Sequence, residues 1–174
     1  HIVSAWATEE GIALGQVATD AKSNEITAIP LLLGQIDLAG TLITVDAMGC
    51  QKEIVEQVVA GGGDCVIAVK DNQPTLLAAI QDFFLGHLER DLEDLRYRYH
   101  ETLDDGRGRI DERSYYLAKV PRDFASAKDW PWVKAIGAPG DAGWFGPDSA
   151  AWQVNGSLAT LVGGPRALLL QACH

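Results

Sequence analysis

"TLITVDAMGCQ", residues 41–51, is the stretch that decides the fold. Its apolar residues Leu42, Ile43 and Val45 predict a short buried strand, and this strand ends on the carboxylate of Asp46. In open α/β sheets, binding and catalytic sites form at the carboxyl ends of strands. The first interpretation of Asp46 is therefore a metal-binding carboxylate at such an end.

A second interpretation makes Asp46 purely structural. Gly49 lets the chain turn into a helix that is predicted to begin near Gln51, and an aspartate just before a helix can cap its free N–H groups. Asp46 lies further upstream of Gln51 than an ideal cap does. Spacing alone leaves both interpretations open.

Strands and helices alternate on both sides of this stretch. The patterns predict a hairpin at 1–19, a helix within 22–40, a strand at 41–46, a helix at 51–60, a strand at 65–70 and a helix at 74–86. The unbroken apolar centre of the strand at 65–70 predicts coverage on both faces. This order predicts an α/β fold, with a mainly parallel sheet, flanking helices and an antiparallel hairpin at the start.

The segment "KDNQPT", residues 70–75, joins the last predicted strand and helix. Pro74 fits the first turn of the helix, and Asn72 or Asp71 is expected to cap it. A polar loop that touches a ligand is the alternative for this segment.

Beyond the last predicted helix the chain changes character twice. Residues 86–114 are highly charged, and short strands are predicted at 115–120 and 130–137. From residue 138 onward Gly, Ala and Pro dominate, and the charged residues are Asp141, Asp148 and Arg166. Residues 1–137 are thus expected to form one domain, followed by a weakly ordered tail at 138–174 with Trp144 and Trp152 outside the core. A frameshift near residue 138 would explain the change.

The charge and cysteine content narrow the function. The net charge of −10 argues against a protein that coats nucleic acid, because phosphate contacts need Lys and Arg. It allows an enzyme that gathers carboxylates to hold cations beside a phosphate. No apolar run is long enough to span a membrane. Cys50, Cys65 and Cys173 show no metal-binding spacing, so reduced thiols and a cytoplasmic location are expected.

A second candidate segment is "DDGRGRIDERSYY", residues 104–116. Three arginines, Arg107, Arg109 and Arg113, alternate there with Asp111 and Glu112. The guanidinium group is a planar donor fork that suits phosphate, while a carboxylate among arginines can hold a metal ion. The alternative is a solvated surface segment linked by salt bridges.

Several strings of this chain together resemble one family. "VSAW", "KSNEITAIPLLL", "GTLITVDAMGCQ", "GGGDCVIAVKDNQ", "GRGRIDERSYY" and "WPWVKAIG" occur in the order typical of the H-repeat-associated, ISAs-type insertion-sequence transposases. The resemblance covers residues 1 to about 137. It implies a DDE transposase catalytic domain with a ribonuclease-H-like fold, in which carboxylates and two Mg²⁺ ions hydrolyse a DNA phosphodiester and join strands.

The resemblance also implies roles for individual residues. Asp46 corresponds to the second carboxylate of the family. The third corresponds to Asp111 by string alignment, or to Glu112 by side-chain reach and because Lys119 follows it at the spacing seen in related enzymes. Asp46, Asp111 and Glu112 are therefore the expected Mg²⁺ ligands, and the expected DNA-binding residues are Arg107, Arg109, Arg113 and Lys119.

The chain departs from the family pattern in three places. The family's first Asp lies upstream of "VSAW", its C-terminal strings are absent after residue 137, and Arg107 stands where the family has His. We therefore expect a partial domain, incomplete at its N-terminus and inactive alone. The alternatives are a non-catalytic remnant with weak DNA contact and, more remotely, a Mg²⁺-dependent phosphatase-like enzyme. We expect the partner to be DNA at the transposon ends. We also expect homo-oligomer formation during transposition and a nucleoid-associated location in a prokaryote.

Overall fold

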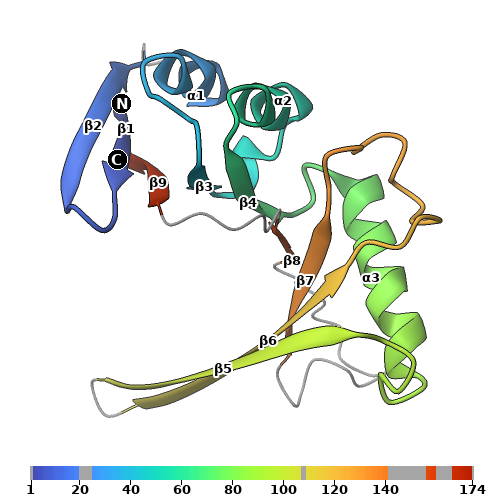
Figure 1. Cartoon of the computed structure of the whole chain (residues 1–174). Helices are drawn as coiled ribbons and strands as arrows, with labels where there is room; N and C mark the ends of the chain where they lie inside the picture. The colour runs from blue at the N-terminus through green and yellow to red at the C-terminus, as the bar shows by residue number, and fades with distance from the viewer. Residues whose placement is uncertain (1, 20–24, 107–108, 141–155, 160–165, 174) are drawn as a thin grey trace. The chain divides into compact units, whose positions relative to one another are not determined.

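The computed structural model describes the backbone of residues 2–19, 25–106, 109–140, 156–159 and 166–173. It describes the side chains of 2–19, 25–101 and 115–138. The chain divides into two compact units (Figure 1). Unit 1 comprises residues 1–68 and 160–174, and unit 2 comprises residues 69–159.

The sheet of unit 1 contains antiparallel and parallel strands. Strands β1 (Ile2–Ala7) and β2 (Ile12–Ala18) form the predicted hairpin, and β3 (Thr41–Val45) runs parallel to β4 (Asp64–Val69). Strand β9 (Arg166–Cys173) lies between β1 and β3, antiparallel to the first and parallel to the second. The strand order is β2-β1-β9-β3-β4. The prediction of an α/β fold that starts with an antiparallel hairpin is confirmed. The prediction of a mainly parallel sheet is wrong, because β1 pairs antiparallel with both of its neighbours and, among the described strands of unit 1, only β3 pairs parallel, with β4 and β9.

The two helices of unit 1 lie on one face of its sheet (Figure 1). Helix α1 (Glu25–Leu33) contacts β1, β2 and helix α2 (Lys52–Ala60). The buried side chains of this layer are Val3, Ala5, Ile29, Leu32, Leu33, Ile43, Ile54, Val55, Val58 and Ile67. Strand β4 alternates between buried and half-buried residues, so the predicted coverage of this strand on both faces is wrong. Val66 and Ala68 are apolar but only half-buried, so the continuous apolar run of β4 did not indicate burial on both faces.

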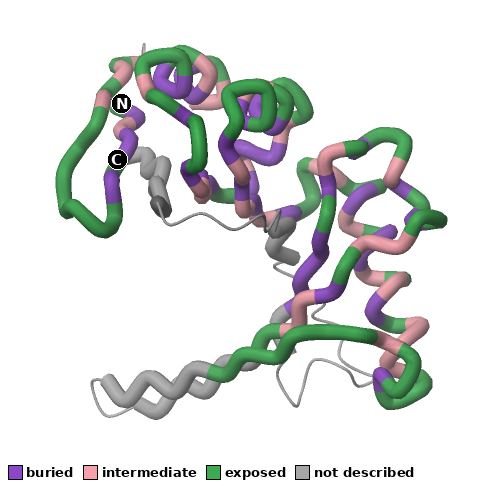
Figure 2. The backbone as a smooth tube through the Cα atoms, viewed as in Figure 1, coloured by how far each residue is buried: buried purple, intermediate pink, exposed green. Residues whose placement is uncertain are grey.

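Unit 2 is built on helix α3 (Pro74–Leu88) and an antiparallel sheet. The sheet comprises β5 (Tyr97–Gly106), β6 (Arg109–Lys119), β7 (Ala135–Gly140) and β8 (Gly156–Ala159), in the order β8-β7-β6-β5. The buried core includes Leu76, Ile80, Phe84, Phe124, Trp130 and Ile136. In Figure 2 the helix carries a buried stripe, whereas the described part of the β5–β6 hairpin is largely exposed.

Three local expectations need correction in unit 2. Helix α3 starts at Pro74 as predicted, but its N-cap residue is Gln73, without a side-chain cap bond, rather than Asn72 or Asp71. The predicted strand at 130–137 begins only at Ala135, because Trp130–Val133 form a turn. The charged segment 86–114 contains the long strand β5, which lacked an apolar period because its described side chains are solvated on both faces.

The described parts of the stretch 138–174 contain regular strands. Strands β8 and β9 both fall within it, and β9 pairs with β1 and β3 along most of its length. These paired strands were not expected from the prediction of a weakly ordered tail. Trp144 and Trp152 lie outside the described residues, and the frameshift near residue 138 stays a prediction.

Candidate active site

Asp46 follows the last residue of β3, at the carboxyl end of the strand. Its side chain is exposed, and its Oδ1 accepts a hydrogen bond of 3.1 Å from the backbone N–H of Met48. This bond makes Asp46 the N-cap of a short 3₁₀ turn, Ala47–Gly49. The bond uses one carboxylate oxygen, Oδ1, of an exposed residue. Asp46 can therefore cap a turn and still offer an oxygen to a ligand.

The capping interpretation thus holds for a different element from the one predicted. Helix α2 has Gln51 as its N-cap residue, and the Gln51 side chain makes no cap hydrogen bond. The 3₁₀ turn stands between Asp46 and this helix. Asp46 lies too far upstream of Gln51 to cap helix α2 because the 3₁₀ turn, which Asp46 does cap, comes between them.

Close packing of the turn onto β3 fixes the backbone around Asp46. A Cβ atom built on Gly49 would lie 2.5 Å from Cγ2 and 2.8 Å from Cγ1 of Val45. Only a residue without a side chain allows this approach. Glycine at position 49 therefore holds the turn against the strand end that carries Asp46.

Asp64, another carboxylate of unit 1, lies at the opposite end of its strand. Asp64 begins β4 and pairs in register with Leu42, whereas Val45, just before Asp46, pairs with Ile67. Burial raises the pKa of the Asp64 carboxyl group above its ordinary value. The parallel register thus keeps Asp64 at the amino end of the strands, away from Asp46.

Asp111 and Glu112 are neighbours in β6, and their side chains lie outside those described. The register pairs Asp111 with Asp104 and Glu112 with Leu103. Neighbouring positions of a strand belong to opposite faces of the sheet. Asp111 and Glu112 therefore occupy alternative faces, and a site on one face can use only one of the two positions.

The strand also changes the meaning of the spacing to Lys119. Lys119 is the last residue of β6 and is exposed. At about 3.4 Å per residue in an antiparallel strand, the seven steps from Glu112 span roughly 24 Å. In a helix the same spacing would place the two residues on one face about two turns apart, at roughly 10.5 Å along the axis. In a strand it no longer favours Glu112 over Asp111.

The predicted site residues are distributed over both units. Asp46 belongs to unit 1, whereas Asp111, Glu112, Arg109, Arg113 and Lys119 belong to β6 of unit 2. Arg107 lies outside the described residues. Among the residues whose side chains are described, no group of three or more His, Cys, Asp or Glu residues could hold a metal ion. The convergence of Asp46 with Asp111 or Glu112 stays a prediction.

The sequence analysis missed one charged cluster, which follows helix α3. His87 Nδ1 lies 2.8 Å from Asp94 Oδ1, and Arg90 Nε donates to Asp94 Oδ2 at 2.8 Å. These bonds, from His87 first and then Arg90, lower the pKa of the Asp94 carboxyl group. Asp91 and Leu92 between them have positive φ angles of 52° and 60°. Because helix α3 ends at Leu88 and the chain turns at Asp91 and Leu92, helical spacing in the sequence gave no signal for this cluster.

Two cysteines of unit 1 are buried thiols. Cys50 and Cys65 have exposed fractions of 0% and 2%, and neither forms a disulfide. Burial, followed by the neighbouring Cys65, raises the pKa of Cys50 to about 12. A thiol with such a pKa stays protonated near neutral pH, so Cys50 is a packing residue and not a nucleophile.

The comparison with family models decides which family the chain represents. Residues 1–120 match the model described as "Transposase DDE domain". The chain belongs to this transposase family. The match covers β1–β4, α1, α2 and the Asp46 turn of unit 1, and helix α3 and the β5–β6 hairpin of unit 2, but not β9.

Similar curated proteins carry related names. The chain is 40% identical over 124 residues to the H repeat-associated putative transposase YbfD of Escherichia coli K12, covering 71% of this chain and 48% of that protein. It is 37% identical over 140 residues to the H repeat-associated putative transposase YhhI of the same strain, covering 78% and 35%. It is 39% identical over 137 residues to the putative transposase YncI of Escherichia coli O157:H7, covering 78% and 34%.

The extent of these matches is partial. The chain spans between about a third and a half of the length of these relatives. No solved structure matches the chain. Within the described part of the chain, none of the helices has the length and apolar character needed to cross a membrane.

Proposed function

We propose that this chain is part of the catalytic core of an insertion-sequence DNA transposase with a ribonuclease-H-like arrangement of its α/β layer. The single observation that carries the proposal is Asp46, an exposed carboxylate at the carboxyl end of β3, inside the segment that matches the transposase DDE domain. Carboxylates at such strand ends can meet both a metal ion and a phosphodiester. The substrate would be DNA at the ends of the mobile element.

The chemistry of Asp46 suits a hard cation. Mg²⁺ prefers oxygen ligands, and Asp46 presents an exposed carboxylate on a backbone fixed by the 3₁₀ turn. Asp111 or Glu112 would supply a further oxygen ligand from β6. When bound, Mg²⁺ would stabilise charge on the attacking and leaving oxygens of the phosphodiester.

The positively charged residues of β6 would hold the DNA backbone. Arg109 and Arg113 flank the two candidate carboxylates in sequence, and Lys119 ends the strand. Arginine can donate two parallel hydrogen bonds to one phosphate, and lysine acts as a point charge. In this proposal the arginines orient the DNA strand, Arg107, which precedes β6 in sequence, adds a further contact, and the carboxylates hold the ions. In this proposal two copies of the protein would assemble on the paired ends of the element, each bound through these β6 residues.

A second candidate function is a non-catalytic transposase remnant that binds DNA weakly. One observation favours it: the described side chains do not include three metal-ligating residues in one place. A single carboxylate such as Asp46 would hold Mg²⁺ weakly, because this ion requires near-octahedral geometry and gives up water reluctantly. The two candidates differ in metal binding and in DNA cleavage.

Binding of Mn²⁺, followed by electron paramagnetic resonance, tests the metal site. The matched variants are Asp46→Asn, which keeps the cap acceptor, Asp111→Asn and Glu112→Gln. We expect Asp46→Asn to weaken Mn²⁺ binding, together with the variant of whichever of Asp111 and Glu112 is the ligand. Unchanged Mn²⁺ binding in Asp46→Asn would refute the proposed site.

A strand-cleavage assay on DNA that carries the element's ends separates the two candidates. Cutting that depends on both Mn²⁺ and Asp46 supports the catalytic function. Mn²⁺ binding without cutting is the result expected of a partial catalytic core that is inactive alone, whereas the absence of both Mn²⁺ binding and cutting supports the non-catalytic alternative.

A further inference from the structure

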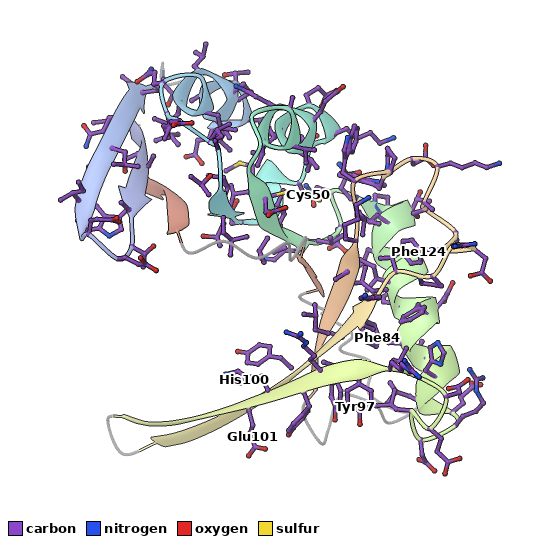
Figure 3. The ribbon with its side chains drawn as sticks, in the orientation of Figure 1. Cys50, Phe84, Tyr97, His100, Glu101 and Phe124 are labelled. Atoms are coloured by element: carbon purple, nitrogen blue, oxygen red, sulfur yellow. The ribbon has the colours of Figure 1, made fainter. Side chains whose placement is uncertain are left out.

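The base of the β5–β6 hairpin has two chemically different faces. The register places Arg98 opposite Leu117 and His100 opposite Tyr115, and Lys119 follows on the same face by strand alternation. We call Arg98, His100, Tyr115 and Lys119 the basic face. The other face carries Tyr97, Tyr99, Glu101 and Tyr116. Figure 3 shows His100 on one side of the hairpin and Tyr97 and Glu101 on the other.

The basic face is exposed and free of carboxylates among the described side chains. Arg98, His100, Tyr115 and Lys119 are all exposed. The ion pairs of the described part of unit 2 join His87 and Arg90 to Asp94, and neither Arg98 nor Lys119 takes part in them. Two permanent positive charges, a histidine and a tyrosine hydroxyl thus share one surface in a chain of net charge −10.

The opposite face is organised among its own residues. Tyr116 packs against Tyr97 and Tyr99, with ring centroids 5.3 and 5.2 Å apart. The Tyr99 hydroxyl donates to Glu101 Oε2 at 2.9 Å. The carboxylate of Glu101 is therefore held on the tyrosine face, where it would repel a polyanion. The tyrosine cluster also stiffens the strands that present the basic face.

We propose that the basic face at the hairpin base binds the phosphate backbone of DNA, as a contact separate from the metal-binding carboxylates. This inference rests on the proposed function, because it takes DNA as the partner. Arg98 and Lys119 supply positive charge for the phosphates. His100 and Tyr115, on the same face, supply hydrogen-bond donors. Such contacts carry no sequence preference, so the face positions DNA and does not select its sequence.

The spacing of the face suits an extended backbone. Alternate residues of a strand are about 6.8 Å apart, which is roughly twice the 3.4 Å axial rise per phosphate along one strand of B-DNA. Arg96, exposed and just before β5, continues the row of Arg98 and His100 with the same two-residue repeat. A row of donors with this repeat can contact successive parts of one DNA strand.

The test is DNA binding measured by fluorescence anisotropy with a labelled duplex of mixed sequence, over a range of salt concentrations. The double variant Arg98→Gln/Lys119→Gln is compared with Arg122→Gln/Lys128→Gln, which removes the same two residue types from exposed positions outside the hairpin. We expect the hairpin variant to bind about tenfold more weakly or worse and the magnitude of its salt slope to fall by about 2, with a much smaller effect in the control.

Each further outcome decides the inference. The exchange Arg98→Lys/Lys119→Arg keeps the charge and should bind like the unmodified chain. If the double variant does not fold by circular dichroism, the single variants should each lower the slope by about 1. Equal losses in the hairpin and control variants would overturn the inference and the proposed DNA contact of Lys119, and would leave the Asp46 metal site of the proposed function standing. No binding of DNA by the unmodified chain at low salt would overturn both.

Discussion

A Cβ atom on Gly49 would lie 2.5 Å from Cγ2 of Val45, which is closer than real Cβ atoms approach other heavy atoms. Val45 is buried in β3, and Asp46 follows it directly. This contact links the glycine of the 3₁₀ turn to the strand end that carries the candidate metal ligand. Three of the four predictions below concern the packing and hydrogen bonds of unit 1.

We expect Gly49→Ala to lower the free energy of unfolding by about 1–3 kcal/mol, because the new methyl group must displace the buried side chain of Val45. The control is Gly86→Ala in helix α3, where an added Cβ meets nothing within 4 Å. That variant should gain about 0.5–1 kcal/mol, because alanine favours a helix over glycine. Urea denaturation measures both, and an unchanged Gly49→Ala would contradict the packing described.

We expect Asp46→Ala to lower the free energy of unfolding by about 0.5–1 kcal/mol through loss of the cap on Met48, measured in a metal chelator. Asp46→Asn should lose less, because an amide oxygen can accept the same bond. The pair thus separates the cap from the charge that Mn²⁺ requires. Equal losses of stability in the two variants would show that the hydrogen bond contributes nothing.

We expect Asp94 to make stability depend on pH only in acid. Its folded-state pKa is lowered, first by His87 and then by Arg90, below the ordinary 3.8. Its contribution is therefore fully present above the unfolded pKa and is lost as pH falls through the folded pKa. The measurement is the difference in unfolding free energy between the unmodified chain and Asp94→Asn. This difference should be constant near neutral pH and should shrink below about pH 4; growth of the difference in acid would refute the assignment.

We expect Cys50 and Cys65 to be protected from thiol reagents in the folded chain. Both side chains are buried, so a reagent in solution cannot reach them. The pKa of Cys50 is also raised to about 12, so little of the reactive thiolate forms near neutral pH. In a Cys173→Ser background, a disulfide reagent should label neither thiol in buffer and both in denaturant. Rapid labelling of the native chain would contradict this prediction and would show that the segment around Cys50, which follows the 3₁₀ turn, opens readily.

The sequence by itself determined the elements that form locally. The apolar residues of β3, α2 and β4 gave their positions to within one or two residues, since strand and helix periods are properties of neighbouring side chains. Pro74 marked the start of α3, because its ring suits the first turn of a helix. The strings around Asp46 indicated the transposase family, which the match over residues 1–120 confirmed.

Only the tertiary structure decided what depends on partners distant in sequence. It placed β9 between β1 and β3, although residues 166–173 show no clear strand period of their own, because pairing with two neighbours supplies the hydrogen bonds. It gave Asp46 a turn of its own to cap, through the approach of Gly49 to Val45. It also set Asp111 and Glu112 in a strand, where they take opposite faces and lie far from Lys119. Residue spacing has a meaning only once the backbone conformation is known, since eight residues span about two helical turns or about 24 Å of strand.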